Sequence, residues 1–346
     1  METPSAIPIS GVMGYLRAHP IVLLLLLTPG IPEYLSTSSP LSNIILNPIF
    51  FPIQLALNLG LYGPGVLLIR EAVLRWKKGW ATMILLGAAY AIFEEGFALR
   101  TMFTSSTGQP VGDLAVYGRW MGINWVWSAG LLIVHIVFSI SLPIMLFGLT
   151  FPDLKSRSLV SSRQTGVLLV ILFIDALILR RVVGYTPGPG IDLLTILVML
   201  GLILVAWMVP IRILSTQKSQ PRRSSRFFAV LGFMVLPFEI LIGAIGDGAK
   251  FPPAGTIAIE AFIALFLIFI LLRSLGTLEN ARQKLALAIG LVTSIALFGL
   301  LASLAFPIVI LADLWMALYL RGLWRSYHAR VYVQGLQLPP PQSTVG

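Results

Sequence analysis

The chain has 346 residues, of which 57% are hydrophobic and only 11% are charged. A soluble globular protein carries about 25% charged residues, so these proportions, with a mean hydropathy of +0.90, exclude a soluble fold and predict an integral membrane protein. The absence of cysteine excludes a disulfide framework, a thiolate metal site and a cysteine nucleophile.

The apolar segments predict an all-α, polytopic membrane helix bundle with about ten transmembrane helices. A bilayer core about 30 Å thick requires about 20 apolar residues per helix. We expect spans near residues 20–35, 44–69, 80–99, 124–151, 165–180, 191–211, 227–245, 256–272, 285–303 and 306–320. Together they form one membrane domain over residues 1–325, and we expect residues 326–346 to form a disordered cytoplasmic tail.

The first apolar run resembles either a signal peptide or a first membrane helix. Arg17 precedes the leucine block, as in a signal peptide, but no small-residue cleavage pattern follows. Pro29, Pro32 and Glu33 come next instead. We therefore expect an uncleaved helix.

The second run contains the segment Gly60–Gly65, which predicts a break in the helix. Pro64 lacks a backbone donor and the glycines loosen the backbone on both sides. We expect residues 66–80 to form an amphipathic helix on the inner membrane surface. Its basic residues are Arg70, Arg75, Lys77 and Lys78.

The last apolar stretch, residues 285–320, is too long for one span, because a helix of this length would measure about 54 Å. Lys284 and Arg321 flank its two ends. We expect a tight hairpin of two helices that turns near Ser303–Pro307.

The formal net charge is +10, with an isoelectric point near 10.1, and most basic residues fall in alternate loops. By the positive-inside rule these loops are cytoplasmic, so both termini are cytoplasmic. We interpret the basic run Gln217–Arg226 as a solvated loop near lipid headgroups. Nucleic acid is therefore not an expected partner. The expected partner is the lipid bilayer, and we expect the membrane to be a prokaryotic plasma membrane.

Glu94 and Glu95 are the most unusual charges, because they are adjacent and lie near the end of an apolar helix. A charge inside lipid costs several kcal/mol, so such a pair requires a cation, a shared proton or a metal. Arg100, one to two turns further on, is the nearest cation in the sequence. The alternative is an interfacial pair neutralised by Arg100 and water.

His135 is the histidine that falls within a predicted span. Counting 1.5 Å per residue places Glu94 roughly 9 Å below the outer boundary and His135 about 12 to 15 Å below it. Consecutive antiparallel helices are usually neighbours. We therefore expect the carboxylates and the imidazole in one layer, with Ser139 one turn below His135. The alternative is a neutral core histidine.

Glu94, Glu95 and His135 around a water or a cation predict a hydrolytic or metal site, with Glu95 and His135 as candidate ligands of a divalent metal such as zinc. The loop that joins the two helices is aromatic and polar. It contains Asp113, Tyr117, the segment Gly118–Gly122 and the segment Asn124–Trp127, and we expect it to cap the site or to form an interfacial belt.

A second group of charges comprises Asp175, Arg180, Arg181, Glu239 and Glu260. We expect Asp175 to pair with an arginine of its own helix. Glu239 and Glu260 either line an outward vestibule or form hydrogen bonds between helices as neutral carboxyls. Asp192, at a helix start, favours the positive end of the helix dipole.

The segment Phe93-Glu-Glu-Gly-Phe-Ala-Leu-Arg100, followed by a helix with His135, resembles the CAAX-protease and bacteriocin-processing (CPBP) family of intramembrane proteases. The resemblance covers residues 85–151. Four residues separate Glu95 from Arg100, whereas three separate the second glutamate from the arginine in the family pattern. The resemblance implies peptide hydrolysis within the membrane. It also implies Glu94 or Glu95 as general base, Arg100 as a structural partner and His135 as a site histidine.

Two functions from different classes follow. The first is an intramembrane hydrolase acting on a membrane-embedded peptide through Glu94, Glu95 and His135. The second is a transporter or channel-like protein in which Glu94, Glu95, Glu239 and Glu260 line an acidic pathway for a cationic solute; a break at Gly60–Gly65 favours it. A membrane scaffold without chemistry is the third possibility.

Overall fold

The computed structural model describes residues 11–104, 117–184, 188–209, 224–275, 281–302 and 308–336. This part of the chain is a helix bundle with one short β-hairpin, β1 (Arg119–Trp120) paired antiparallel with β2 (Ile123–Asn124). The helices are α1 (Gly11–Ala18), α2 (Pro20–Pro29), α3 (Asn43–Leu46), α4 (Phe50–Arg75), α5 (Trp80–Ala91), α6 (Trp125–Val134), α7 (Leu142–Thr150), α8 (Ser162–Val183), α9 (Pro189–Met208), α10 (Ser225–Gly248), α11 (Pro253–Leu275), α12 (Ala281–Ala302) and α13 (Val309–Leu336). Three π-helical segments interrupt or extend them: η1 (Gly30–Leu35), η2 (Ile92–Ala98) and η4 (His135–Ser141).

Each of the ten predicted spans overlaps a helix, and seven helices of the described chain are long and apolar enough to cross a membrane. The seven are Phe50–Arg75, Trp80–Ala98, Trp125–Thr150, Gly190–Met208, Ser225–Gly248, Pro253–Ile270 and Ala281–Ala302. The helical segment Pro20–Leu35 is apolar but shorter. The all-α membrane class is therefore confirmed, and the full count of ten spans stays a prediction.

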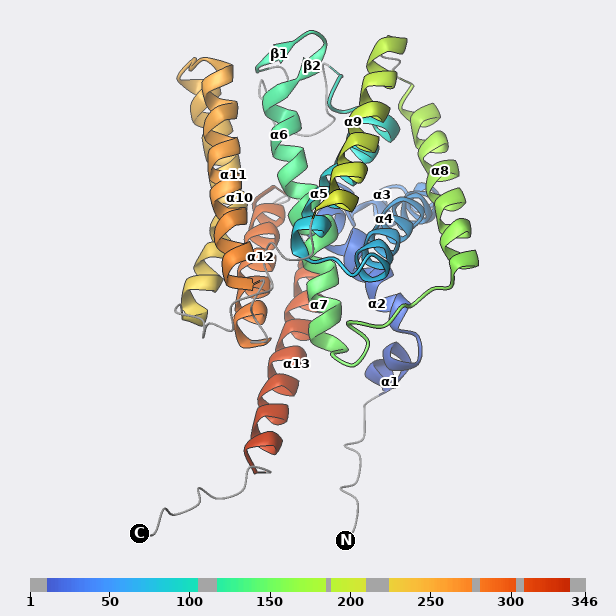
Figure 1. Cartoon of the computed structure of the whole chain (residues 1–346), viewed down its shortest axis with the longest axis vertical. Coiled ribbons are helices and arrows are strands. Elements are labelled where there is room, and N and C mark those ends of the chain that lie inside the picture. The colour runs from blue at the N-terminus through green and yellow to red at the C-terminus, as the bar shows by residue number, and fades with distance from the viewer. Residues whose placement is uncertain are drawn as a thin grey trace.

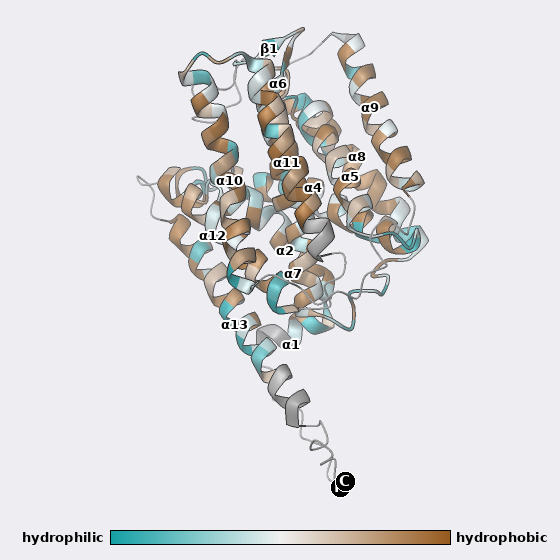
Figure 2. Ribbon diagram, turned by 60° about the vertical axis from the view of Figure 1, so that its left-hand side comes forward, coloured by the Kyte–Doolittle hydropathy of each residue, from teal (hydrophilic) through white to brown (hydrophobic). Residues whose placement is uncertain are grey.

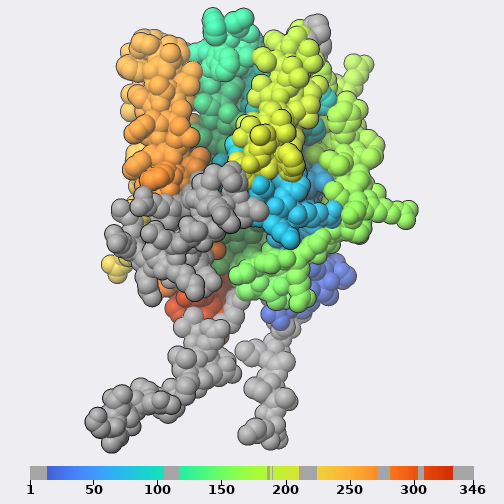
Figure 3. All heavy atoms as spheres, viewed as in Figure 1, coloured from blue at the N-terminus to red at the C-terminus, as the bar shows by residue number. Residues whose placement is uncertain are grey.

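The apolar surface agrees with a lipid-facing exterior. On α8–α11 many leucines, isoleucines and phenylalanines are exposed, among them Leu197 at 57% and Phe262 at 69%. Figure 2 shows these helices as largely hydrophobic ribbons. In Figure 3, α6 is visible between α11 and α9. These exposed side chains would be unfavourable in water and favourable in lipid.

The first and last described helices lie toward the same end of the molecule. In Figure 1, α1 and the last turns of α13 lie at the bottom, and β1 and β2 lie at the top. This arrangement agrees with both termini on one side of a membrane. That this side is the cytoplasm stays a prediction of the positive-inside rule.

The predicted break at Gly60–Gly65 is wrong, because α4 continues through it with Pro64 inside the helix. The glycines serve packing instead. A Cβ atom would come within 2.6 Å of Asp175 at Gly60, 2.4 Å of Leu25 at Gly63 and 2.3 Å of Tyr90 at Gly65. The motif therefore lets α8, α2 and α5 approach one helix closely, as small residues do in membrane bundles.

The predicted amphipathic surface helix at residues 66–80 is also wrong. Arg70 is 3% exposed and pairs with Glu71 at 2.9 Å inside α4. Its guanidinium also donates to the carbonyls of Leu154 and Arg157, and Glu71 accepts from the backbone N–H of Leu159. Through these bonds the buried ion pair fastens the connection between α7 and α8 to α4.

The C-terminal expectations are partly corrected. α13 continues to Leu336, so residues 326–336 are helical rather than part of a disordered tail. Residues 337–346 lie outside the described chain. So do residues 303–307, where the hairpin turn was expected, and residues 210–223, which contain most of the basic run.

α10 and α12 pack through two glycines. A Cβ atom at Gly290 of α12 would lie 2.0 Å from the carbonyl oxygen of Ala229, and one at Gly232 of α10 would lie 2.5 Å from that of Leu287. Each glycine therefore lets the backbone of one helix touch the backbone of the other.

We predict that Gly290→Ala lowers the free energy of unfolding by about 1–3 kcal/mol, because backbone atoms cannot move aside as a flexible side chain can. The measurement is the thermal unfolding midpoint in detergent. Gly201→Ala on α9 is the matched control, since no atom lies within 4 Å of its added Cβ. An unchanged midpoint for Gly290→Ala would contradict this packing.

Candidate functional site

The three π-helical segments carry the charged residues of the candidate site. Glu33 lies in η1, Glu94 and Glu95 in η2, and His135 in η4. In η2 the N–H of Leu99 donates to the carbonyl of Glu94, five residues earlier, at 2.8 Å. A π-helical turn holds one residue more than an α-helical turn and often occurs at functional sites, because it redirects side chains.

Local sequence favours these irregular turns. Pro32 lies within η1, and Pro143 is the second residue after the end of η4. A proline has no N–H to complete the regular helical ladder. In η2, Gly96 allows close approach of α9, since a Cβ atom there would meet Thr195 at 2.9 Å.

His135 lies between the two adjacent glutamates and touches both. Its Nε2 is 2.8 Å from Glu95 Oε1, and its Nδ1 is 3.1 Å from Glu94 Oε2. The exposed fractions are 0% for Glu94, 6% for Glu95 and 3% for His135. The prediction that carboxylates and imidazole share one layer is confirmed. Ser139 joins them as expected, with its Oγ 3.0 Å from Nδ1 of His135.

The two glutamates differ in how their oxygens are used. Both carboxylate oxygens of Glu95 are held: Oε1 contacts His135, and Oε2 accepts a hydrogen bond from the Thr101 hydroxyl. Both oxygens of Glu94 are buried without a hydrogen-bond partner among the described residues, although Oε2 is within ion-pair distance of His135. A buried carboxylate with free acceptor capacity is costly, and it is the group here that can receive a water or another ligand.

Among the described residues the ion pairs of Glu94 and Glu95 are with His135, and a separate ion pair involves Arg100. Its ion pair is with Asp192 at 3.8 Å, and Asp192 also binds Arg180 at 2.5 Å. Arg180 in turn donates to the carbonyl of Phe97 at 3.1 Å and lies over its ring. The interaction therefore fastens η2 to α8 and α9. Asp192 thus serves in an ion-pair network and not only at its helix start.

The loop after η2 braces the site from one end. Asn124, at the end of β2, donates to the carbonyl of Thr104 at 2.6 Å, and its N–H donates to the carbonyl of Met102. Arg119 of β1 donates to the carbonyls of Phe103 and Thr104. These bonds fix residues 101–104, including the Thr101 that holds Glu95. Asp113 lies outside the described chain.

Sequence reasoning missed Glu33 and Tyr62. The Tyr62 hydroxyl donates to Glu33 Oε1 at 2.5 Å, and its ring lies nearly parallel to the His135 ring, with centroids 6.4 Å apart. Glu33 falls near the end of the first predicted span, and Tyr62 falls within Gly60–Gly65, where a helix break was predicted. The available signal was a carboxylate within an apolar segment, which by itself marks a candidate site.

The second acidic group lies elsewhere. Asp175 packs against Gly60, and of the two arginines of its helix Arg180 binds Asp192. Glu239 lies against Gly130 of α6, and Glu260 of α11 is 2% exposed. None of the three belongs to the Glu94, Glu95 and His135 cluster.

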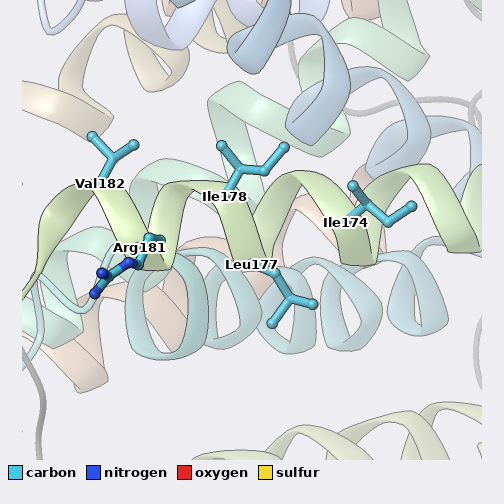
Figure 4. Close-up of a pocket in the computed structure, with 5 residues that line it drawn as sticks. All are labelled: Ile174, Leu177, Ile178, Arg181 and Val182. Atoms are coloured by element: carbon cyan, nitrogen blue, oxygen red, sulfur yellow. The ribbon is translucent and has the colours of Figure 1, made fainter.

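A pocket of about 350 Å³ lies on the outer surface of α8, lined by Ile174, Leu177, Ile178, Arg181 and Val182. Figure 4 shows that these five side chains all come from this one helix. The pocket contains none of the clustered residues and we assign it no chemistry.

The donor set of the cluster suits a divalent metal. One ligand atom from each of Glu94, Glu95 and His135 lies within 4.8 Å of the others. In a tetrahedral zinc site with bonds of about 2.0–2.1 Å, ligand atoms lie about 3.4 Å apart, so small side-chain rotations would let them meet one ion. Thr101 and Ser139 supply the hydrogen bonds around the ligands that metal sites require.

Comparison of the chain with protein-family models, with curated proteins and with solved structures gives no match.

We predict opposite effects of one substitution at the two glutamates. Glu94→Met removes a buried carboxylate that accepts no hydrogen bond among the described residues and whose contact with His135 Nδ1 is shared with Ser139, so the thermal unfolding midpoint in detergent should stay constant or rise. Glu95→Met leaves His135 and Thr101 without their partner, so the free energy of unfolding should fall by about 2–4 kcal/mol. Equal losses at both positions would show that Glu94 has a structural partner.

Proposed function

We propose that the protein is an intramembrane hydrolase that cleaves a membrane-embedded peptide at the Glu94, Glu95 and His135 cluster. One observation carries the proposal: Glu94 is fully buried and, among the described residues, its carboxylate is contacted by His135 at 3.1 Å but accepts no hydrogen bond of good geometry, while the neighbouring Glu95 and His135 are held in place. A free base beside an ordered pair is the arrangement that water activation requires.

In the proposed reaction Glu94 accepts a proton from water. The water oxygen attacks the carbonyl carbon of the peptide, and the C–N bond then breaks. Glu94 returns the proton to the leaving nitrogen. His135, adjacent to both carboxylates, stabilises the charge that develops, and Glu95 fixes its orientation through Nε2.

Glu95 and His135 are the residues that would hold a divalent metal at this site. Such an ion, when bound, lowers the pKa of its water to about 7 and polarises a carbonyl.

Two further points support hydrolysis over transport. The helix break that favoured a transporter is absent, since α4 is continuous. The resemblance of residues 93–100 and His135 to the CPBP proteases also favours hydrolysis. The ion pair of Arg100 with Asp192 differs from the partnership with a glutamate that this resemblance implies.

The first test is cleavage of synthetic single-span apolar peptides by the purified protein in lipid nanodiscs, followed by mass spectrometry. Glu94→Gln keeps the side-chain shape and removes the base, so the cleavage rate should fall by at least about 100-fold. Glu260→Gln is the matched control, because it neutralises a buried membrane carboxyl outside the cluster. Cleavage by Glu94→Gln at the wild-type rate would refute the assigned base.

The second test is metal content. We expect the detergent-solubilised wild type to retain stoichiometric zinc or another divalent metal after dialysis, as measured by mass spectrometry of the metal. Glu95→Gln and His135→Ala should lose it, because each removes a ligand. Glu260→Gln should retain it. Retention of the metal by both Glu95→Gln and His135→Ala would place the ion elsewhere.

A further inference from the structure

His135 must keep one ring orientation for the cluster to work. Its Nε2 faces Glu95 and its Nδ1 faces Glu94, on opposite sides of the ring. Rotation of the imidazole about its χ2 angle would break both contacts at once. The side chains that pack against the ring therefore decide whether the cluster is assembled.

Two tyrosines pack beside the imidazole. The Tyr62 ring lies at 21° to it, and the Tyr90 ring meets it at 64°, each with centroids 6.4 Å apart. The two tyrosine rings are themselves 6.2 Å apart. These separations fall within the range in which aromatic rings attract one another.

Tyr62 is anchored from the far side of the ring. Its hydroxyl donates to Glu33 Oε1 at 2.5 Å, and Glu33 Oε2 accepts a second hydrogen bond from the Ser39 hydroxyl at 2.6 Å. Asn58 of α4 donates to Ser39 at 3.1 Å, which completes a chain of hydrogen bonds. The chain links the segment after η1 to α4.

The backbone around Glu33 is fixed by its neighbours. A Cβ atom at Gly299 of α12 would lie 1.7 Å from the carbonyl oxygen of Leu35. α12 therefore packs directly against the backbone of η1. Glu33, which anchors Tyr62, is thus fixed both by its hydrogen bonds and by the packing of α12 against η1.

We propose that Tyr62 and Glu33 are positioning residues of the site: Glu33 holds the Tyr62 hydroxyl, and the Tyr62 ring holds the His135 imidazole between the two glutamates. The role of Glu33 is to accept a hydrogen bond, and its charge is not required. This inference deepens the proposed hydrolysis and rests on it.

The test observes His135 directly. The chain has three histidines, so a sample with ¹⁵N-labelled histidine in detergent micelles gives few imidazole signals, and loss of a signal in His135→Ala assigns it. The ¹⁵N shifts report which ring nitrogen is protonated or hydrogen-bonded. Peptide cleavage is measured on the same samples, with kcat and KM determined separately.

Tyr62→Phe keeps the ring and removes the anchor, and Glu33→Leu removes the acceptor. Both should broaden or split the His135 signals. Both should also lower kcat by about 10-fold to 100-fold with little change in KM, because the reacting groups are misplaced. Glu33→Gln retains an acceptor oxygen and should restore the His135 spectrum relative to Glu33→Leu.

Tyr319→Phe is the matched control. The Tyr319 hydroxyl bonds to Thr150 at 2.7 Å, away from the cluster, so its loss lowers stability without disturbing His135. Unchanged His135 signals in both Tyr62→Phe and Glu33→Leu would overturn the proposal. So would a disturbance by Glu33→Gln as large as that by Glu33→Leu, since the charge of Glu33 would then be the cause.

The two proposals fail in different ways. If the wild type cleaves no peptide, hydrolysis is refuted, while the His135 spectra still decide whether Tyr62 and Glu33 position the ring. If the wild type cleaves peptides and the spectra of the variants are unchanged, the positioning role alone is refuted.

Discussion

The contact between His135 of η4 and Glu95 of η2 is the interaction around which the site is organised, with 2.8 Å between Nε2 and Oε1. Charged groups buried in a membrane protein have no water to solvate them, so each must find a partner inside the bundle. This requirement brings η2 against η4 and places Thr101 and Ser139 at the remaining polar atoms. Glu94 is held less firmly: its Oε2 lies 3.1 Å from Nδ1 of His135, but neither oxygen accepts a hydrogen bond among the described residues, which gives the cluster its capacity to act on a ligand.

The surrounding helices supply the rigidity that such a cluster needs. Asp192 and Arg180 fasten η2 to α8 and α9, and Gly299 brings α12 against the backbone of η1. The π-helical turns lose regular hydrogen bonds, yet each carries a titratable residue of the site. η2 and η4 carry the cluster, and η1 carries the neighbouring Glu33. A regular helix would direct these side chains differently, so the π-helical turns link the fold to the chemistry.

Composition and periodicity were sufficient to predict the membrane helices, because lipid requires long apolar segments. Helix depth was sufficient to bring Glu94, Glu95 and His135 together. The error at Gly60–Gly65 came from treating glycine and proline as breakers, whereas packing against three neighbouring helices keeps α4 intact. The partner of Arg100 and the role of Glu33 depend on contacts between distant segments. Local sequence does not encode such contacts, so these two features were not predictable.

A double-mutant cycle between Glu95 and His135 tests most directly whether one buried contact organises this site. The free energy of unfolding is measured in detergent for wild type, Glu95→Gln, His135→Ala and the double variant. We expect a coupling energy of about 1.5–3 kcal/mol, as for hydrogen-bonded groups that carry charge. Effects that add to within about 0.5 kcal/mol would show that the two side chains do not interact, and would contradict the site as described.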